Sequence, residues 1–266
     1  MKRSTRVFLD IAIPVALYSL IILVSQLAVV LVFTVVYYAA YAGAAADSAI
    51  SGLDQFLADR NGLISCISTL LVVAVIFADT RIKRVKVKDY TLFSKPIGAR
   101  NIIMSAIAGI SFSVWIGTML SMLPIPDKLM DKYAEVSSAM GDTTPVFIVT
   151  AILLAPLVEE MVFRGIIYKH LRICMPEYPA IILQAVIFAV LHEGSIVWMV
   201  YALVGGLLMG YIAMLTGSIR ASIATHVAFN LVSFLPMGNT LYLVIAAVSP
   251  VLLILSVRDI YKQSVK

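Results

Sequence analysis

The stretch LAPLVEEMVFRG, residues 154–165, places two adjacent glutamates and an arginine inside an apolar run that extends from residue 145 to residue 168. Such a run is long enough to cross a bilayer, because about 20 mainly apolar helical residues span the hydrocarbon core. Ionisable side chains are costly there and are typical of functional sites that face the interior of a helix bundle. The stretch therefore predicts a membrane-spanning helix and a site built on it.

The rest of the chain has the same membrane character. Of its 266 residues, 61% are hydrophobic and 13% are charged, whereas a soluble domain is roughly half apolar and a quarter charged. Composition therefore predicts an all-α, multi-pass membrane protein, and apolar segments of spanning length give about eight transmembrane helices. The expected spans are approximately 11–41, 62–78, 101–123, 145–168, 179–193, 196–216, 218–235 and 240–257.

The basic residues predict the orientation of these spans. The net charge is +5, but no basic patch is interleaved with aromatics, so we expect no nucleic-acid partner. With both termini in the cytoplasm, all but three of the 20 Lys and Arg residues lie on the cytoplasmic side, as the positive-inside rule requires. The exceptions are Arg60, Lys128 and Lys132. We interpret the basic segment 81–100 as a topology determinant, with contact to anionic lipid as the alternative.

A polar loop at residues 124–144 divides the chain. Apolar residues recur around its charged ones, which indicates an interfacial helix. We expect a transmembrane scaffold over residues 1–144, a core that carries the intramembrane polar residues over 145–257, and a basic cytoplasmic tail over 258–266. Within the core, the G-x-x-x-G pattern of Gly206 and Gly210 predicts close helix packing, with dimerisation as the alternative.

Polar residues of the core lie in three of its spans. They are Glu159, Glu160 and Arg164 in the fourth span, His192 at the end of the fifth, and His226 and Asn230 in the seventh. Glu160 and Arg164 are four residues apart, so they share a helix face and can form an ion pair. Glu159 is rotated by about 100° from Glu160. Arg164 is therefore expected to neutralise Glu160 and to leave Glu159 free as a candidate base.

The two histidines have neighbours at helical spacing. Phe188 is four residues before His192 and is expected to pack beneath its imidazole. A carboxylate, two imidazoles and the Asn230 carboxamide can then converge from three helices. In a hydrolase, Glu159 and one imidazole would polarise a water, while the other imidazole and the amide would bind the oxyanion. Alternatively, Glu159, His192 and His226 bind a zinc ion that holds a water in its fourth position.

Another function class fits the same residues. Buried Glu, His and Arg are also components of proton-coupled transporters, so the residues alone support a hydrolase and a transporter about equally. A purely structural polar network is less favoured. The sequence shows no inverted repeat with broken helices, which is the more usual transporter pattern.

Three motifs resemble those of the CAAX-protease and bacteriocin-processing family of intramembrane endopeptidases. EEMVFR at 159–164 is similar to the family's E-E-x-x-x-R motif. FAVLH at 188–192 looks like its F-x-x-x-H motif, and HVAFN at 226–230 looks like its H-x-x-x-N motif. Their order and approximate spacing agree with the family, and each lies on a predicted membrane helix. The resemblance extends over residues 145–235, roughly.

The resemblance implies an eight-helix bundle whose active site is sunk in the membrane, with the catalytic core at residues 145–257. It implies that Glu159 and His192 activate the attacking water. It implies that His226 and Asn230 stabilise the oxyanion. The residues expected to support this site are Glu160, Arg164 and Phe188.

The resemblance also implies substrates and a cofactor. The eukaryotic branch of the family removes the last three residues of prenylated CAAX proteins, and bacterial relatives are linked to leader-peptide processing and bacteriocin self-immunity. We therefore expect an endopeptidase of a bacterial cell membrane, with a membrane-associated peptide or protein and the lipid bilayer as its partners. The family is often called a metalloprotease, so a divalent ion such as zinc is the candidate cofactor. A non-catalytic immunity or scaffold protein is the alternative.

Overall fold

The computed structural model describes residues 3–41, 46–92, 95–139, 144–192, 194–234 and 240–265. Over these residues the regular structure is entirely helical and no strand is present. This is the outcome expected in lipid, because a helix satisfies its backbone polar groups within one segment. The prediction of an all-α fold is confirmed.

Each predicted span corresponds to a helix of the structure. Six of the helices are long and apolar enough to cross a membrane. They contain α1 (Arg3–Ala40), α3 (Asn61–Ile82), α5 (Ala99–Met122), the continuous helix Pro145–Cys174, α11 (Ile196–Thr216) and α13 (Thr240–Ser264). The other two, α10 (Glu177–Val190) and α12 (Ile219–Val232), have 14 residues each, which is about 21 Å of helix against a hydrocarbon core of about 30 Å. The count of eight spans therefore stays a prediction.

Three shorter helices lie between these spans. The helix expected within residues 124–144 is α6 (Asp127–Ala139), and its Tyr133 ring lies 6.2 Å from that of Trp198 on α11. The sequence did not predict α2 (Ala46–Ala58) or α4 (Val87–Tyr90). Both join longer apolar helices, where charged and polar residues obscure the hydropathy pattern.

The fourth span changes its winding along its length. It consists of α7 (Pro145–Val149), the π-helix η1 (Thr150–Leu154), α8 (Ala155–Glu160), the π-helix η2 (Met161–Ile167) and α9 (Tyr168–Cys174). Pro145 begins the helix, and Thr144 caps it by accepting a hydrogen bond from the Phe147 N–H at 3.3 Å. Two π-helical segments therefore flank the six residues that carry both glutamates, and π-turns are frequent at functional sites.

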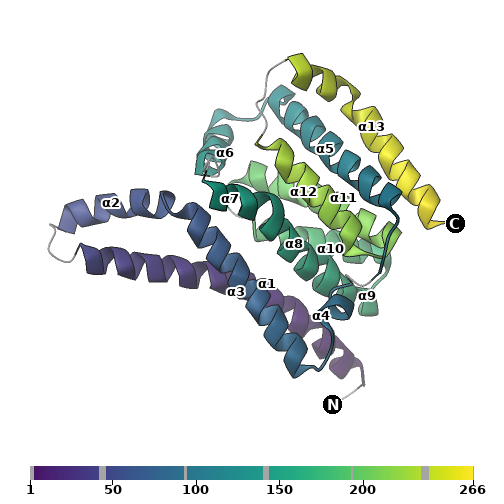
Figure 1. Cartoon of the computed structure of the whole chain (residues 1–266), viewed down its shortest axis with the longest axis horizontal. Helices are drawn as coiled ribbons and strands as arrows, with labels where there is room; N and C mark the ends of the chain where they lie inside the picture. Colours follow the sequence, from purple (N-terminus) through teal and green to yellow (C-terminus); the bar gives the residue numbers. More distant parts are fainter. Residues whose placement is uncertain are drawn as a thin grey trace.

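The helices form two parts (Figure 1). In one part, α1 and α3 run antiparallel beside each other and project from the bundle with α2 at their far end. In the other part, α12 and α13 pack on α5, and α10 packs on α11. The fourth span lies between the two parts and contacts α3 on one side and α12 on the other.

Close contact between α10 and α11 depends on two glycines. A β-carbon on Gly206 would lie 3.2 Å from the Ala185 β-carbon, and one on Gly210 would lie 2.6 Å from Gln184 Nε2. The predicted packing role of the G-x-x-x-G pattern is confirmed. This approach exposes the Gly206 carbonyl to α10 and to the fourth span.

The segments predicted to be cytoplasmic meet at one end of the structure. Arg100 Nε donates to Asp259 at 2.8 Å, Ser218 Oγ donates to the Lys95 carbonyl at 2.8 Å, and Lys169 Nζ donates to the Asp89 carbonyl at 3.1 Å. These contacts agree with placing the segments on the same side of the bilayer, while the side itself stays a prediction. Since α13 continues to Ser264, the predicted tail is helical over most of its length.

Candidate active site

The fourth span separates its two adjacent carboxylates. Arg164 Nη1 donates to Glu160 Oε1 at 2.6 Å, and both side chains are fully buried. The Glu159 side chain points elsewhere and is 26% exposed. The ion pair predicted from the four-residue spacing is present, and so is the unpaired neighbour.

Arg164 belongs to a fully buried cluster with Glu160 and Gln184, which we call the closed layer. Its Nη2 donates to the Gly206 carbonyl at 3.1 Å, and Gln184 Nε2 donates to the same carbonyl at 3.0 Å. The Arg164 guanidinium also lies over the Phe188 ring, 4.8 Å from its centroid. Gln184, which is fully buried, did not stand out in the sequence. A single glutamine within an apolar span was its only signal.

His226 connects the two glutamates. Its Nδ1 lies 2.9 Å from Glu160 Oε1, and its Nε2 lies 3.7 Å from Glu159 Oε2. Because an ionised Glu160 can only accept, Nδ1 carries the hydrogen and Nε2 of a neutral ring is an acceptor. An imidazolium at His226 would instead donate from Nε2, and it would balance the charges of two carboxylates and one guanidinium.

His192 is oriented by the end of α10. Its Nδ1 lies 2.7 Å from the Phe188 carbonyl, and its ring packs on the Phe188 ring with centroids 4.1 Å apart. The predicted packing of Phe188 beneath the imidazole is therefore present. The bond to the carbonyl assigns the hydrogen to Nδ1 and turns the Nε2 lone pair of the neutral ring outward. This Nε2 lies 4.0 Å from Glu159 Oε2.

The structure thus brings Glu159, His192 and His226 together around one oxygen atom, Glu159 Oε2. The two separations, 3.7 and 4.0 Å, are longer than direct hydrogen bonds, and polar groups at such distances are commonly bridged by water. Glu159 and His192 are both about one quarter exposed. The group can therefore be reached from outside the protein interior, unlike the Glu160–Arg164 pair.

Asn230 has a partner that the sequence did not predict. Its Nδ2 donates to the Ala151 carbonyl at 2.9 Å, so this amide hydrogen bonds the main chain of η1 in the fourth span. Pro156, five residues after Ala151, is the sequence signal for this contact. A proline inside a helix leaves a carbonyl of the preceding turn without a backbone donor.

The residues suit a metal ion in type but not in spacing. One carboxylate and two imidazoles are ligands that zinc accepts. Ligand atoms of a tetrahedral zinc ion lie roughly 3.3 Å apart, given metal–ligand distances of about 2.0–2.1 Å. The separations between Glu159 and the two imidazoles exceed that value, and no group of three His, Cys, Asp or Glu residues in the described ranges could hold an ion.

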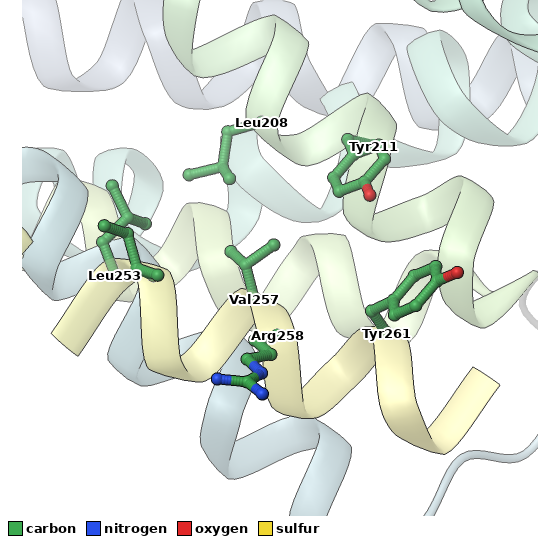
Figure 2. A pocket seen from close by; sticks show the side chains of 7 residues that line it. Leu208, Tyr211, Leu253, Val257, Arg258 and Tyr261 are labelled. Carbon is green, nitrogen blue, oxygen red and sulfur yellow. The ribbon is translucent and has the colours of Figure 1, made fainter. Parts of the chain in front are cut away.

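An apolar groove lies away from this site. It has a volume of about 520 Å³ and lies between α11 and α13 (Figure 2). The residues lining it are Leu208, Tyr211, Leu253, Ile254, Val257, Arg258 and Tyr261. None of them belongs to the polar group around Glu159, so this groove is not the candidate active site.

The comparison with protein families identifies the same part of the chain. Residues 141–232 match the family described as type II CAAX prenyl endopeptidase Rce1-like. The match confirms the predicted resemblance to CAAX-protease-type endopeptidases, and it contains every site residue from Glu159 to Asn230. It does not extend to helices α1–α6 or to α13. No curated protein and no solved structure matches the chain.

Proposed function

We propose that this protein is an intramembrane endopeptidase that hydrolyses a peptide bond with a water activated by Glu159. One observation carries the proposal: two imidazole nitrogens, His226 Nε2 and His192 Nε2, face the same carboxylate oxygen at 3.7 and 4.0 Å. This constellation lies within the segment that matches a family of CAAX prenyl endopeptidases.

In the first step, a water between Glu159 and His192 attacks the carbonyl carbon of the substrate. Glu159 takes one proton of the water as the new carbon–oxygen bond forms. His192 Nε2 accepts a hydrogen bond from the other O–H of the water and so orients it. The carbonyl oxygen becomes an oxyanion. An imidazolium at His226 donates to it from Nε2, the ring atom that faces Glu159.

In the second step, the tetrahedral intermediate breaks down. Glu159 returns its proton to the nitrogen of the leaving amine, and the carbon–nitrogen bond breaks. The closed layer supports both steps, because Glu160 holds His226 Nδ1 at 2.9 Å and Arg164 holds Glu160 at 2.6 Å. His192 is fixed by the Phe188 carbonyl at 2.7 Å, so the Nδ1 atoms of both imidazoles are bonded and their Nε2 atoms face the reactants.

The substrate that we propose is a membrane-associated peptide or protein, of the prenylated CAAX type or the leader and bacteriocin type. The site lies on helices with apolar surfaces, so a substrate anchored in the membrane reaches it without leaving the bilayer. The match to a prenyl endopeptidase family supports the first type. We propose a cell membrane, and a bacterial one, as the location.

The test is cleavage by purified protein in detergent. A farnesylated CAAX peptide, the same peptide without the lipid and a leader-type peptide are incubated with wild type, Glu159→Gln and Glu135→Gln, and the products are identified by mass spectrometry. Glu135 is the matched control because it is an exposed glutamate on α6. We expect cleavage by wild type and Glu135→Gln, and a loss of at least about 10³-fold in Glu159→Gln, since base and proton donor are both removed.

Two outcomes would overturn the proposal. Cleavage by Glu159→Gln at the wild-type rate would exclude Glu159 as the base. Proton-coupled uptake into proteoliposomes without cleavage of any peptide would establish the transporter alternative. A zinc chelator, compared with its non-chelating isomer, tests the ion separately: chelator-sensitive cleavage would show that the three side chains close around a metal in the active form.

A further inference from the structure

The π-helix η1 leaves one carbonyl without a backbone donor. The Ala155 N–H donates to the Thr150 carbonyl, five residues earlier, as a π-turn requires. In the same register the Ala151 carbonyl would receive the N–H of residue 156, but that residue is a proline and has none. A carbonyl left unpaired inside a membrane bundle is destabilising, and neighbouring helices commonly supply the missing donor.

Asn230 supplies that donor from α12. Its Nδ2 lies 2.9 Å from the Ala151 carbonyl oxygen. One turn before it on α12, His226 contacts Glu160 at 2.9 Å. Helix α12 is thus attached to the fourth span on both sides of Pro156, once at η1 and once at the last residue of α8.

The winding of η1 decides where the glutamates point. A π-turn places one extra residue in the helix, and one residue corresponds to a rotation of about 100°. If η1 closed into a regular α-turn, Glu159 would rotate relative to α7 into the direction that Glu160 now occupies. It would then face the buried side of the span and not the two imidazoles.

We propose that Asn230 is a positioning residue, which keeps Glu159 directed at His192 and His226 by holding the π-turn at Ala151 open. This role differs from the oxyanion contact that the motif resemblance implies, because it acts through the main chain of the fourth span. The inference rests on the proposed function where activity is measured, and on the structure alone where stability is measured.

A double-mutant cycle between Asn230→Ala and Pro156→Ala tests the proposal. Alanine at 156 restores the missing N–H, so the Ala151 carbonyl no longer depends on Asn230. We expect Asn230→Ala to lower kcat by about 100-fold in the wild-type background, the scale of loss for a misplaced catalytic group, and by less than about threefold in the Pro156→Ala background. Equal losses in both backgrounds would show a direct contact with the reacting atoms and overturn the proposal.

The pH dependence of kcat gives an independent readout. If Glu159 leaves the imidazoles in Asn230→Ala, the acid limb of the profile is displaced, because this limb reports the base and its surroundings. Loss of an oxyanion donor lowers the whole profile without moving the limb. A profile that is lowered but not displaced would therefore contradict a positioning role.

Thermal unfolding in detergent tests the contact between Asn230 and Ala151 without an activity measurement. It therefore applies even if Pro156→Ala is inactive or no substrate is cleaved. We expect Asn230→Ala to lower Tm with Pro156 present and to leave Tm unchanged in the Pro156→Ala background. A Pro250→Ala background is the control, since Pro250 lies within α13, and there the loss should equal that in wild type. An equal drop in Tm in all three backgrounds would refute the attachment of Asn230 to Ala151, whatever the fate of the proposed activity.

Discussion

The fourth span places two adjacent glutamates in opposite surroundings. Glu160 lies in a closed, buried region, and Glu159 lies in an open, partly exposed one. Around Glu160 the side chains are buried and its Oε1 is paired: Arg164 and His226 both contact this oxygen, and Arg164 also donates to the Gly206 carbonyl. Around Glu159 the carboxylate is 26% exposed, and two imidazole nitrogens approach it without bonding it. One residue of helical rotation separates a structural centre from a carboxylate that neither imidazole bonds directly. Burial with partners confers orientation, and partial exposure leaves room for a reactant.

The largest effect on stability is expected at Arg164. Replacing it with methionine leaves the fully buried Glu160 without its guanidinium, and breaking a buried pair on one side costs about 3–5 kcal/mol. The free energy of unfolding can be measured by titration with a denaturing detergent. The double variant Glu160→Leu/Arg164→Met should recover most of the loss, because no buried charge remains. A loss below about 1 kcal/mol in the single variant would mean that Glu160 is not held as a buried charge.

A smaller difference is expected between the two histidines. His226 is 5% exposed and bonded to Glu160, whereas His192 is 24% exposed. Removing the buried partner of a carboxylate costs about 1–3 kcal/mol, so His226→Ala should destabilise the protein by that amount and His192→Ala by about half as much or less. Both variants should lose cleavage. Equal destabilisation would remove the distinction between a closed and an open region.

Much of this arrangement follows from helical periodicity. The positions of Glu159 and Glu160 on different faces, the pairing of Glu160 with Arg164 and the stacking of Phe188 on His192 depend only on residues that are neighbours along one helix. The pair forms even though residues 161–167 are π-helical, because a position four residues on still lies close to one full turn away. Local spacing was therefore sufficient for these contacts.

Other contacts depend on how separate helices meet. Gln184 reaches the closed layer only because Gly206 and Gly210 let α11 approach α10, and no periodicity in α10 predicts that. The partner of Asn230 depends on η1, whose winding is not encoded by a hydropathy pattern. The short helix α10 is apolar without the length of a span, and α12 is both short and interrupted by Arg220, His226 and Asn230, so the number of crossings could not be read from apolar segments alone.

Gln184 provides an intermediate test of the closed region. In Gln184→Leu the Gly206 carbonyl keeps its bond from Arg164 and loses one of its two side-chain donors. Hydrogen bonds between membrane helices contribute about 0.6 kcal/mol on average and about 1.7 at most, so we expect a loss in this range in the same detergent titration. The variant Gln184→Ala also removes packing volume and should be less stable than Gln184→Leu. A loss as large as that of Arg164→Met would show that the glutamine, and not the ion pair, holds the layer together.

At Glu159 we expect the smallest effect on stability and the largest effect on activity. Glu159→Gln keeps the shape of the side chain, removes a partly exposed charge and breaks no direct hydrogen bond to either imidazole, since both are farther than 3.5 Å from Glu159 Oε2. The free energy of unfolding should therefore change by less than about 0.5 kcal/mol, while cleavage falls by at least about 10³-fold. Glu160→Gln, one position away, is the matched control and should be the less stable of the two, because Arg164 then lacks its counter-charge. If Glu159→Gln were as destabilising as Glu160→Gln, both carboxylates would be structural, and the open region would hold no base.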